Sequence, residues 1–125
     1  MAERKKILVV DDNQNFSSLL QCALEDDFDV DTAQDGQEGL DKALLAPPDL
    51  IITDVMMPNV SGVEMLRSLM ADENARNVPV IVATGSHFNT SVESLFKQER
   101  NVKGFISKTT PIDDIIGLVK KVLGL

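Results

Sequence analysis

Five short apolar runs alternate along the chain with segments whose apolar residues recur at helical spacing, and the connectors between them are short. Alternation of this kind favours a mostly parallel sheet covered by helices on both faces. The five runs are Lys6–Val10, Phe28–Ala33, Leu50–Thr53, Val78–Ala83 and Val102–Ser107. The sequence therefore predicts an α/β fold with a doubly wound, five-stranded parallel sheet.

The polarity of the five runs predicts their order in the sheet. Phe28–Ala33 and Val102–Ser107 alternate apolar with polar residues, which is typical of edge strands. The other three runs are almost continuously apolar, as expected for strands buried on both faces. These features favour the order 2-1-3-4-5 of flavodoxin-like sheets, in which ligands bind outside the carboxyl ends of the first and third strands.

Local signals predict where the helices begin and which faces they bury. Capping boxes at Asp35 and Ser61 open two helices, and a third begins at Thr90 with the thinnest apolar stripe. Thr110 is expected to cap the last helix, with Pro111 at its first helical position. The first helix is expected to bury an apolar stripe made of Phe16, Leu19, Leu20, Ala23 and Leu24, and Cys22 is expected to fill the core beside them.

Acidic residues follow two of the central strands. Asp11 and Asp12 come after the first run, and Asp54 ends the third. Three carboxylates at one sheet edge repel one another unless a cation lies among them. Oxygen ligands without His or Cys suit a hard cation such as Mg²⁺. Two simpler interpretations stay open, because Asp54 alone could cap its own turn and the acidic pair could favour the start of a helix.

Two further polar residues reach the same predicted crevice. Thr84 follows the fourth run, and Lys108 follows the fifth. A hydroxyl and an ammonium that face a carboxylate and a metal would form an anion site of phosphoryl size. A strand-end Thr often only forms a turn, and a loop Lys is usually solvated. The convergence of five such positions at the expected strand ends favours a functional site.

The pattern Asp54-x-x-Met57-Pro58-x-x-x-Gly62, together with these four other residues, resembles the response-regulator receiver domain of the CheY-like family over essentially the whole chain. The resemblance implies that Asp54 accepts a phosphoryl group from a phosphohistidine of a sensor histidine kinase or phosphotransfer protein. It also implies that Asp12, Asp54 and the backbone carbonyl of Met56 hold Mg²⁺, with Asp11 acting through water. Lys108 would pair with the phosphoryl oxygens, and Thr84 would donate a hydrogen bond to one of them.

The same resemblance assigns Phe105 the role of a switch aromatic that changes the surface of the fourth helix, fifth strand and fifth helix. An ordinary edge-strand aromatic is the alternative. The resemblance further implies a signalling receiver that catalyses only its own phosphorylation and dephosphorylation. Such a receiver would act on an output protein or domain and could form a phosphorylation-dependent homodimer. One departure concerns Lys108, because Thr109 stands where the family usually has proline, which leaves the geometry of that peptide bond open.

Composition and spacing narrow the remaining function classes. The formal net charge of −8 argues against direct binding to nucleic acid or to anionic membranes. Without an apolar run long enough for a bilayer, a cytoplasmic location is expected. A haloacid-dehalogenase-type phosphatase would need two aspartates one residue apart, and a flavodoxin would need a phosphate loop free of aspartate. We expect residues 1–125 to form a single receiver domain with no output domain.

Overall fold

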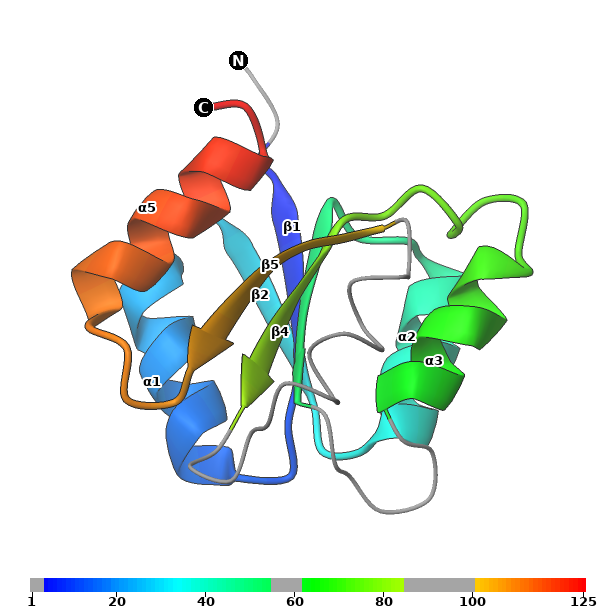
Figure 1. The fold of residues 1–125 in the computed structure, drawn as a ribbon, viewed down its shortest axis with the longest axis horizontal. Helices are drawn as coiled ribbons and strands as arrows, with labels where there is room; N and C mark the ends of the chain where they lie inside the picture. The colour runs from blue at the N-terminus through cyan, green and yellow to red at the C-terminus, as the bar shows by residue number, and fades with distance from the viewer. Residues whose placement is uncertain (1–3, 55–61, 85–100) are drawn as a thin grey trace.

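The computed structural model describes residues 4–54, 62–84 and 101–125. Five parallel strands form one sheet in the order β2-β1-β3-β4-β5 (Figure 1). The strands are β1 (Lys6–Val10), β2 (Asp29–Ala33), β3 (Leu50–Asp54), β4 (Val80–Thr84) and β5 (Val102–Ser107). The described helices are α1 (Gln14–Leu24), α2 (Gly36–Leu45), α3 (Gly62–Met70) and α5 (Ile112–Val122). The predicted fold class and strand order are confirmed.

The sheet separates two apolar clusters. In Figure 1, α1 and α5 cover one face, and α2 and α3 cover the other. Successive residues of β1 face opposite sides, so Ile7 and Val9 join the cluster under α1 and α5, whereas Leu8 and Val10 join the cluster under α2 and α3. Burial of both faces explains why the central strands are almost continuously apolar.

The register of the ladders brings the carboxyl ends of the central strands to one edge. Val10 lies opposite Thr53 in β3, and Asp54 lies opposite Ala83 in β4. Thr84 in turn lies opposite Ser107, the last residue of β5. The residues that follow these positions therefore emerge close together, although up to 97 positions separate Asp11 and Lys108 in sequence.

Two expectations for α1 are wrong. Leu19 is 49% exposed, and Cys22 is an exposed free thiol. The buried residues of α1 are Phe16, Ser17, Leu20 and Leu24. The helix is therefore rotated on the sheet toward Ser17, which leaves Leu19 on its flank and Cys22 on the opposite side.

The start of α5 also differs from the prediction. Helix α5 begins at Ile112, so Pro111 is the residue that precedes the first helical position. The carbonyl oxygen of Pro111 accepts hydrogen bonds from the N–H groups of Asp114 at 3.0 Å and Ile115 at 3.1 Å. Thr110 does not cap the helix, because its Oγ1 atom accepts the N–H of Ser107 at 3.0 Å.

Several expectations concern residues outside the described ranges: Met56, the turn from Met57 to Ser61, and the helix that opens at Thr90. Across residues 4–54, 62–84 and 101–125, no helix has the length and apolar character needed to span a bilayer.

Candidate functional site

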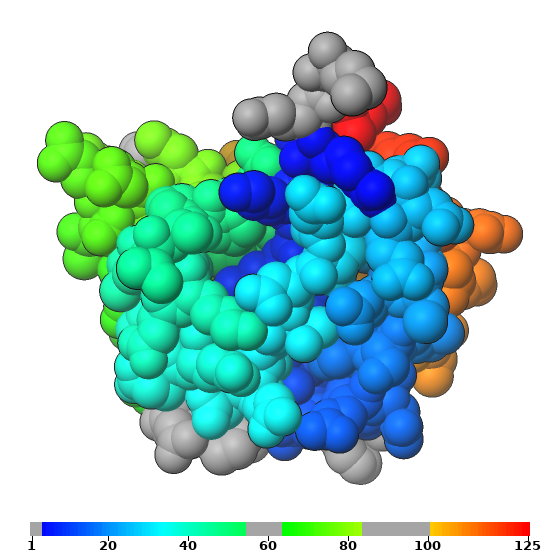
Figure 2. All heavy atoms as spheres, turned by 180° about the vertical axis from the view of Figure 1, so that it is seen from behind, coloured from blue at the N-terminus to red at the C-terminus, as the bar shows by residue number. Residues whose placement is uncertain are grey.

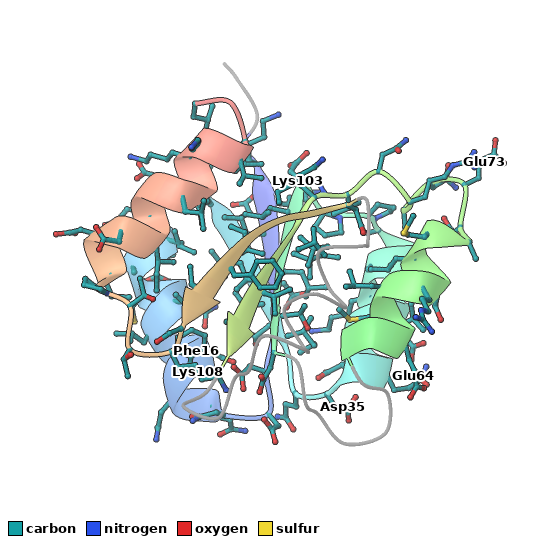
Figure 3. The ribbon with its side chains drawn as sticks, viewed as in Figure 1. Phe16, Asp35, Glu64, Glu73, Lys103 and Lys108 are labelled. Carbon is teal, nitrogen blue, oxygen red and sulfur yellow. The ribbon has the colours of Figure 1, made fainter. Side chains whose placement is uncertain are left out.

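Four of the predicted site residues meet where β1, β3 and β5 end. Asp11 and Asp12 directly follow β1, Asp54 is the last residue of β3, and Lys108 directly follows β5. Lys108 lies at the end of the sheet toward which the β4 and β5 arrows point (Figure 3). The ends of the adjacent strands β1 and β3 thus supply the carboxylates, and the end of the edge strand β5 supplies the ammonium.

The Lys108 ammonium bridges the two buried carboxylates. Its Nζ atom donates hydrogen bonds to Asp11 Oδ1 and to Asp54 Oδ2, each at 3.0 Å. Nζ also lies 2.9 Å from Asp11 Oδ2. The side chains of Lys108, Asp11 and Asp54 are 20%, 1% and 12% exposed. At this burial the ion pairs are partly shielded from water, so they fix the positions of the groups more firmly than surface pairs do.

Asp11 is held tightly in the turn between β1 and α1. The backbone N–H of Asn13 donates to Asp11 Oδ1 at 2.8 Å. Asn13 itself caps α1, because its Oδ1 atom accepts the N–H groups of Asn15 at 3.0 Å and Phe16 at 3.3 Å. Burial raises the pKa of the Asp11 carboxyl and outweighs the opposite effect of Lys108 and Asn13, and the charge of Asp54 adds to the rise.

Lys108 responds in the opposite sense to the same surroundings. Burial alone would lower the pKa of its ammonium, but the hydrogen bonds and charges of Asp11 and Asp54 raise the pKa above the ordinary lysine value. Lys108 is therefore a permanent cation at neutral pH.

The arrangement of carboxylates fits a hard cation. Asp11, Asp12 and Asp54 each offer one carboxylate oxygen, and these atoms all lie within 4.8 Å of one another. Asp12 is exposed, so ligands from solvent can approach. Asp11 Oδ2 is buried and, among the described residues, is paired only electrostatically with the Lys108 ammonium at 2.9 Å, so it can still accept a hydrogen bond from a metal-bound water.

A hydroxyl-rich turn holds the backbone of Lys108. The N–H of Thr109 donates to Ser107 Oγ at 2.9 Å, and the hydroxyls of Ser107 and Thr109 are 2.6 Å apart. Thr110 both donates its N–H to the Ser107 carbonyl and accepts the Ser107 N–H, each at 3.0 Å. Among the described residues no peptide bond is cis, so Lys108–Thr109 is trans. Side-chain hydrogen bonds thus order this turn without a proline after the lysine.

Sequence reasoning missed one contact of the site. Phe16 was expected only as a core residue of the first helix, and it does pack in the cluster under α1 and α5. Its ring also lies under the Lys108 ammonium, with Nζ 5.5 Å from the ring centroid. No local sequence pattern indicates this contact, because it joins α1 to the turn after β5.

The remaining predicted site residues are Thr84, Met56 and Phe105. Thr84 closes β4 opposite Ser107, and Met56 lies outside the described residues. Phe105 is partly buried in β5 and packs against the cluster under α2 and α3. The structure thus brings together Asp11, Asp12, Asp54 and Lys108, and it puts Thr84 on an adjacent strand end.

Two hollows differ in their relation to this site. One of 460 Å³ lies between α2 and the amino-terminal halves of β1 and β2, and Figure 2 shows it near the middle of that face. Its charges are largely matched, since Lys42 pairs with Asp31 at 3.1 Å. The other, of 140 Å³, is lined by Asp11 together with polar residues of α1 and β2. The smaller hollow adjoins the carboxylates, whereas the larger lies away from them.

Comparison with known proteins agrees with this geometry. Residues 7–120 match the profile of the family described as response regulator receiver domain. The response regulator ArlR of Staphylococcus aureus strain Mu50 is 31% identical over 119 residues, which are 94% of this chain and 52% of that protein. The chain therefore spans about half the length of the curated relatives it matches.

Solved structures share the fold over nearly the whole chain. Chemotaxis protein CheY4 of Vibrio cholerae superposes with a TM-score of 0.87 at 26% identity, covering 96% of this chain and 99% of that one. A response regulator receiver domain protein of Clostridium thermocellum superposes with a TM-score of 0.81 at 25% identity, covering 96% and 94% of the two chains.

Proposed function

The chain belongs to the response regulator receiver family of two-component signalling, and on that premise we propose that it accepts a phosphoryl group on Asp54 in a Mg²⁺-dependent reaction. The donor is a phosphohistidine of a sensor histidine kinase or phosphotransfer protein, since response regulators act with such kinases. The observation that carries the proposal is the Lys108 ammonium bridging Asp11 and Asp54 at 2.9 to 3.0 Å.

In the proposed transfer, a carboxylate oxygen of Asp54 attacks the phosphorus atom. The P–N bond to the donor histidine breaks, and the imidazole nitrogen keeps the electron pair. The positive charge of Lys108 then compensates the negative charge on the phosphoryl oxygens of the transferred group. Thr84, at the end of the neighbouring strand, donates a hydrogen bond to one of these oxygens.

The carboxylates support Mg²⁺ as the cofactor. Asp12 and Asp54 would hold the metal together with the backbone carbonyl of Met56, and Asp11 would hold one of its waters. When bound, Mg²⁺ neutralises the charge that gathers on the phosphoryl oxygens. The exposed position of Asp12 and the remaining acceptor capacity of Asp11 Oδ2 favour this division of roles.

The readout proposed for the phosphorylated state is a changed surface around Phe105. Thr84 moves toward the phosphoryl group, the Phe105 ring takes the vacated space, and the surface of the fourth helix, β5 and α5 changes for an output protein or domain. One added dianion at Asp54 is sufficient to bias such a two-state element. The chain acts in this scheme as a single receiver domain whose chemistry is limited to its own phosphorylation and dephosphorylation.

Intact mass after incubation with acetyl phosphate tests the proposal. The wild type gains one phosphoryl group when Mg²⁺ is present and none when it is chelated, and Asp54→Asn gains none under either condition. Asp41→Asn, on the exposed side of α2, serves as the matched control and reacts like the wild type. Phosphorylation of Asp54→Asn at the wild-type rate, or a wild type that binds Mg²⁺ but gains no mass from this donor or from a histidine kinase, would refute the proposal.

A further inference from the structure

We infer that Phe16 is a positioning residue for Lys108, holding the ammonium at the mouth of the site through a cation–π contact; this inference rests on the function proposed for Asp54. The two residues come from different elements, α1 and the turn after β5, and Nζ lies 5.5 Å from the centroid of the ring. Figure 3 shows both side chains at the carboxyl end of the sheet. This separation is within the range in which an ammonium is attracted to an aromatic face.

The ring is itself rigidly placed. Phe16 is 6% exposed and packs in the apolar cluster that also contains Ile106 and Ile115. Its backbone N–H is fixed by the cap of α1, where it donates to Asn13 Oδ1 at 3.3 Å. A side chain anchored at both ends offers a stationary aromatic ring to the Lys108 ammonium, which lies 5.5 Å from the ring centroid.

The ring supplies a contact that the carboxylates cannot keep throughout the reaction. In the unphosphorylated chain, Lys108 donates to Asp11 and Asp54. Both carboxylates change partners when Asp54 becomes the phosphoryl acceptor and Asp11 holds a metal-bound water. Phe16 neither titrates nor binds a metal, so its contact with the ammonium persists while the charged partners exchange.

The nature of the turn after β5 makes this contact more important. Lys108 is followed by Thr109 and Thr110, whose hydroxyl hydrogen bonds order the backbone. Those bonds end at the backbone and do not reach the side chain of Lys108. The ring of Phe16 lies near the ammonium itself, so the turn positions the residue and the ring helps to position its charge.

Phe16→Leu removes the aromatic face and keeps an apolar side chain in the core. The expected result is a phosphorylation rate with acetyl phosphate about three- to tenfold lower than that of the wild type, the loss expected for one partly desolvated cation–π contact. Phe28→Leu is the matched control, because Phe28 is 2% exposed in the same apolar cluster and contributes no contact to Lys108 that the structure describes. This variant reacts at the wild-type rate even if its stability falls equally.

A double-mutant cycle separates positioning from general damage. Lys108→Met slows the reaction, and adding Phe16→Leu to it produces no further loss, because the ring then has no ammonium to hold. If Phe16→Leu slows the Lys108→Met protein by the same factor as the wild type, the role of Phe16 is structural and the inference is wrong. An unchanged rate for Phe16→Leu alone also refutes it.

A readout without phosphorylation keeps this inference distinct from the proposed function. In protein labelled with ¹³C-lysine, the Lys108 ε-CH₂ resonance is assigned by its loss in Lys108→Met. The ring shifts this resonance in the wild type and in Phe28→Leu, with and without Mg²⁺, and the shift is lost in Phe16→Leu. A shift that disappears on adding Mg²⁺ overturns the inference. A wild type that retains the shift but never gains a phosphoryl group instead refutes the proposed function.

Discussion

At the scale of single residues, the Lys108 ammonium reduces the repulsion between the Asp11 and Asp54 carboxylates. Asp11 is almost fully buried beside the charge of Asp54, and burial raises its pKa. The ammonium between the two compensates this cost, and its own pKa is raised by the same contacts. The site therefore already holds one cation, and any metal must share the carboxylates with it.

Lys108→Met is expected to strengthen Mg²⁺ binding while it slows phosphorylation. Removing a positive charge about 3 Å from the carboxylates abolishes its repulsion of the metal, so the dissociation constant for Mg²⁺ falls on the order of tenfold. Isothermal calorimetry measures this directly. Lys120→Met is the control. Lys120 is exposed in the last turn of α5, and its ammonium lies 3.9 Å from a carboxylate oxygen of Asp27. Weaker binding in Lys108→Met would mean that the ammonium organises the carboxylates for the metal.

At the scale of elements, close approach of α2 to β1 supports the strand that directly precedes Asp11. Gly39 of α2 is buried, and a Cβ atom there would lie 2.7 and 2.8 Å from the two methyl groups of Val10. Val10 is fully buried, and its β-branched side chain has little freedom to move aside. The missing side chain is therefore a packing requirement of this helix–sheet contact.

The same substitution on two helices should have opposite effects. Gly39→Ala is expected to lower the free energy of unfolding by about 1–2 kcal/mol, because the overpacking cost exceeds the gain in helix propensity. Gly117→Ala, in α5 with open space around it, is expected to raise it by roughly 0.5–1 kcal/mol. Urea denaturation measures both. Stabilisation by Gly39→Ala would show that α2 can move away from β1 without cost.

At the scale of the whole molecule, the sheet separates two apolar clusters, and the candidate site lies at its carboxyl edge. Lys108 and Phe16 connect the site to the cluster under α1 and α5, whereas Phe105 of β5 contacts the cluster under α2 and α3. The edge strand β5 contributes to both, because it ends next to Lys108 and carries Phe105. Strand β5 is therefore one physical connection between Asp54, through Lys108, and both faces of the sheet.

Hydrogen exchange should show that phosphorylation acts mainly through β4 and β5. With Mg²⁺ and excess acetyl phosphate, exchange rates are expected to change in β4, β5 and the start of α5, and to stay constant in β2 and the carboxyl-terminal half of α2. The reason is that the dianion at Asp54 is linked to β5 through Lys108. Asp54→Asn under the same conditions provides the baseline. Equal changes in β2 and β5 would contradict a response directed through the fifth strand.

Much of this molecule follows from the sequence alone. Continuous apolar runs and alternating runs predicted the parallel sheet and its strand order. A strand buried on both faces is apolar at every position, whereas an edge strand buried on one face alternates apolar with polar residues. The ends of those runs also identified Asp11, Asp12, Asp54, Thr84 and Lys108, since the carboxyl ends of parallel strands share one edge. The helix cap at Asp35 was also predictable, because capping depends on residues adjacent in sequence. The Asp35 Oδ1 atom accepts the Glu38 N–H at 2.8 Å.

Only the tertiary structure decided how helices rotate on the sheet and which distant groups touch. The apolar stripe of α1 includes Leu19, yet packing against β1 and α5 turns that residue outward and buries Ser17. The contact of Phe16 with Lys108 depends on the placement of two elements far apart in sequence, so no local pattern encodes it. Periodicity and strand ends in the sequence by itself indicated that Asp11, Asp54 and Lys108 meet at one sheet edge. Packing in three dimensions determined how these groups are held there and added the ring of Phe16.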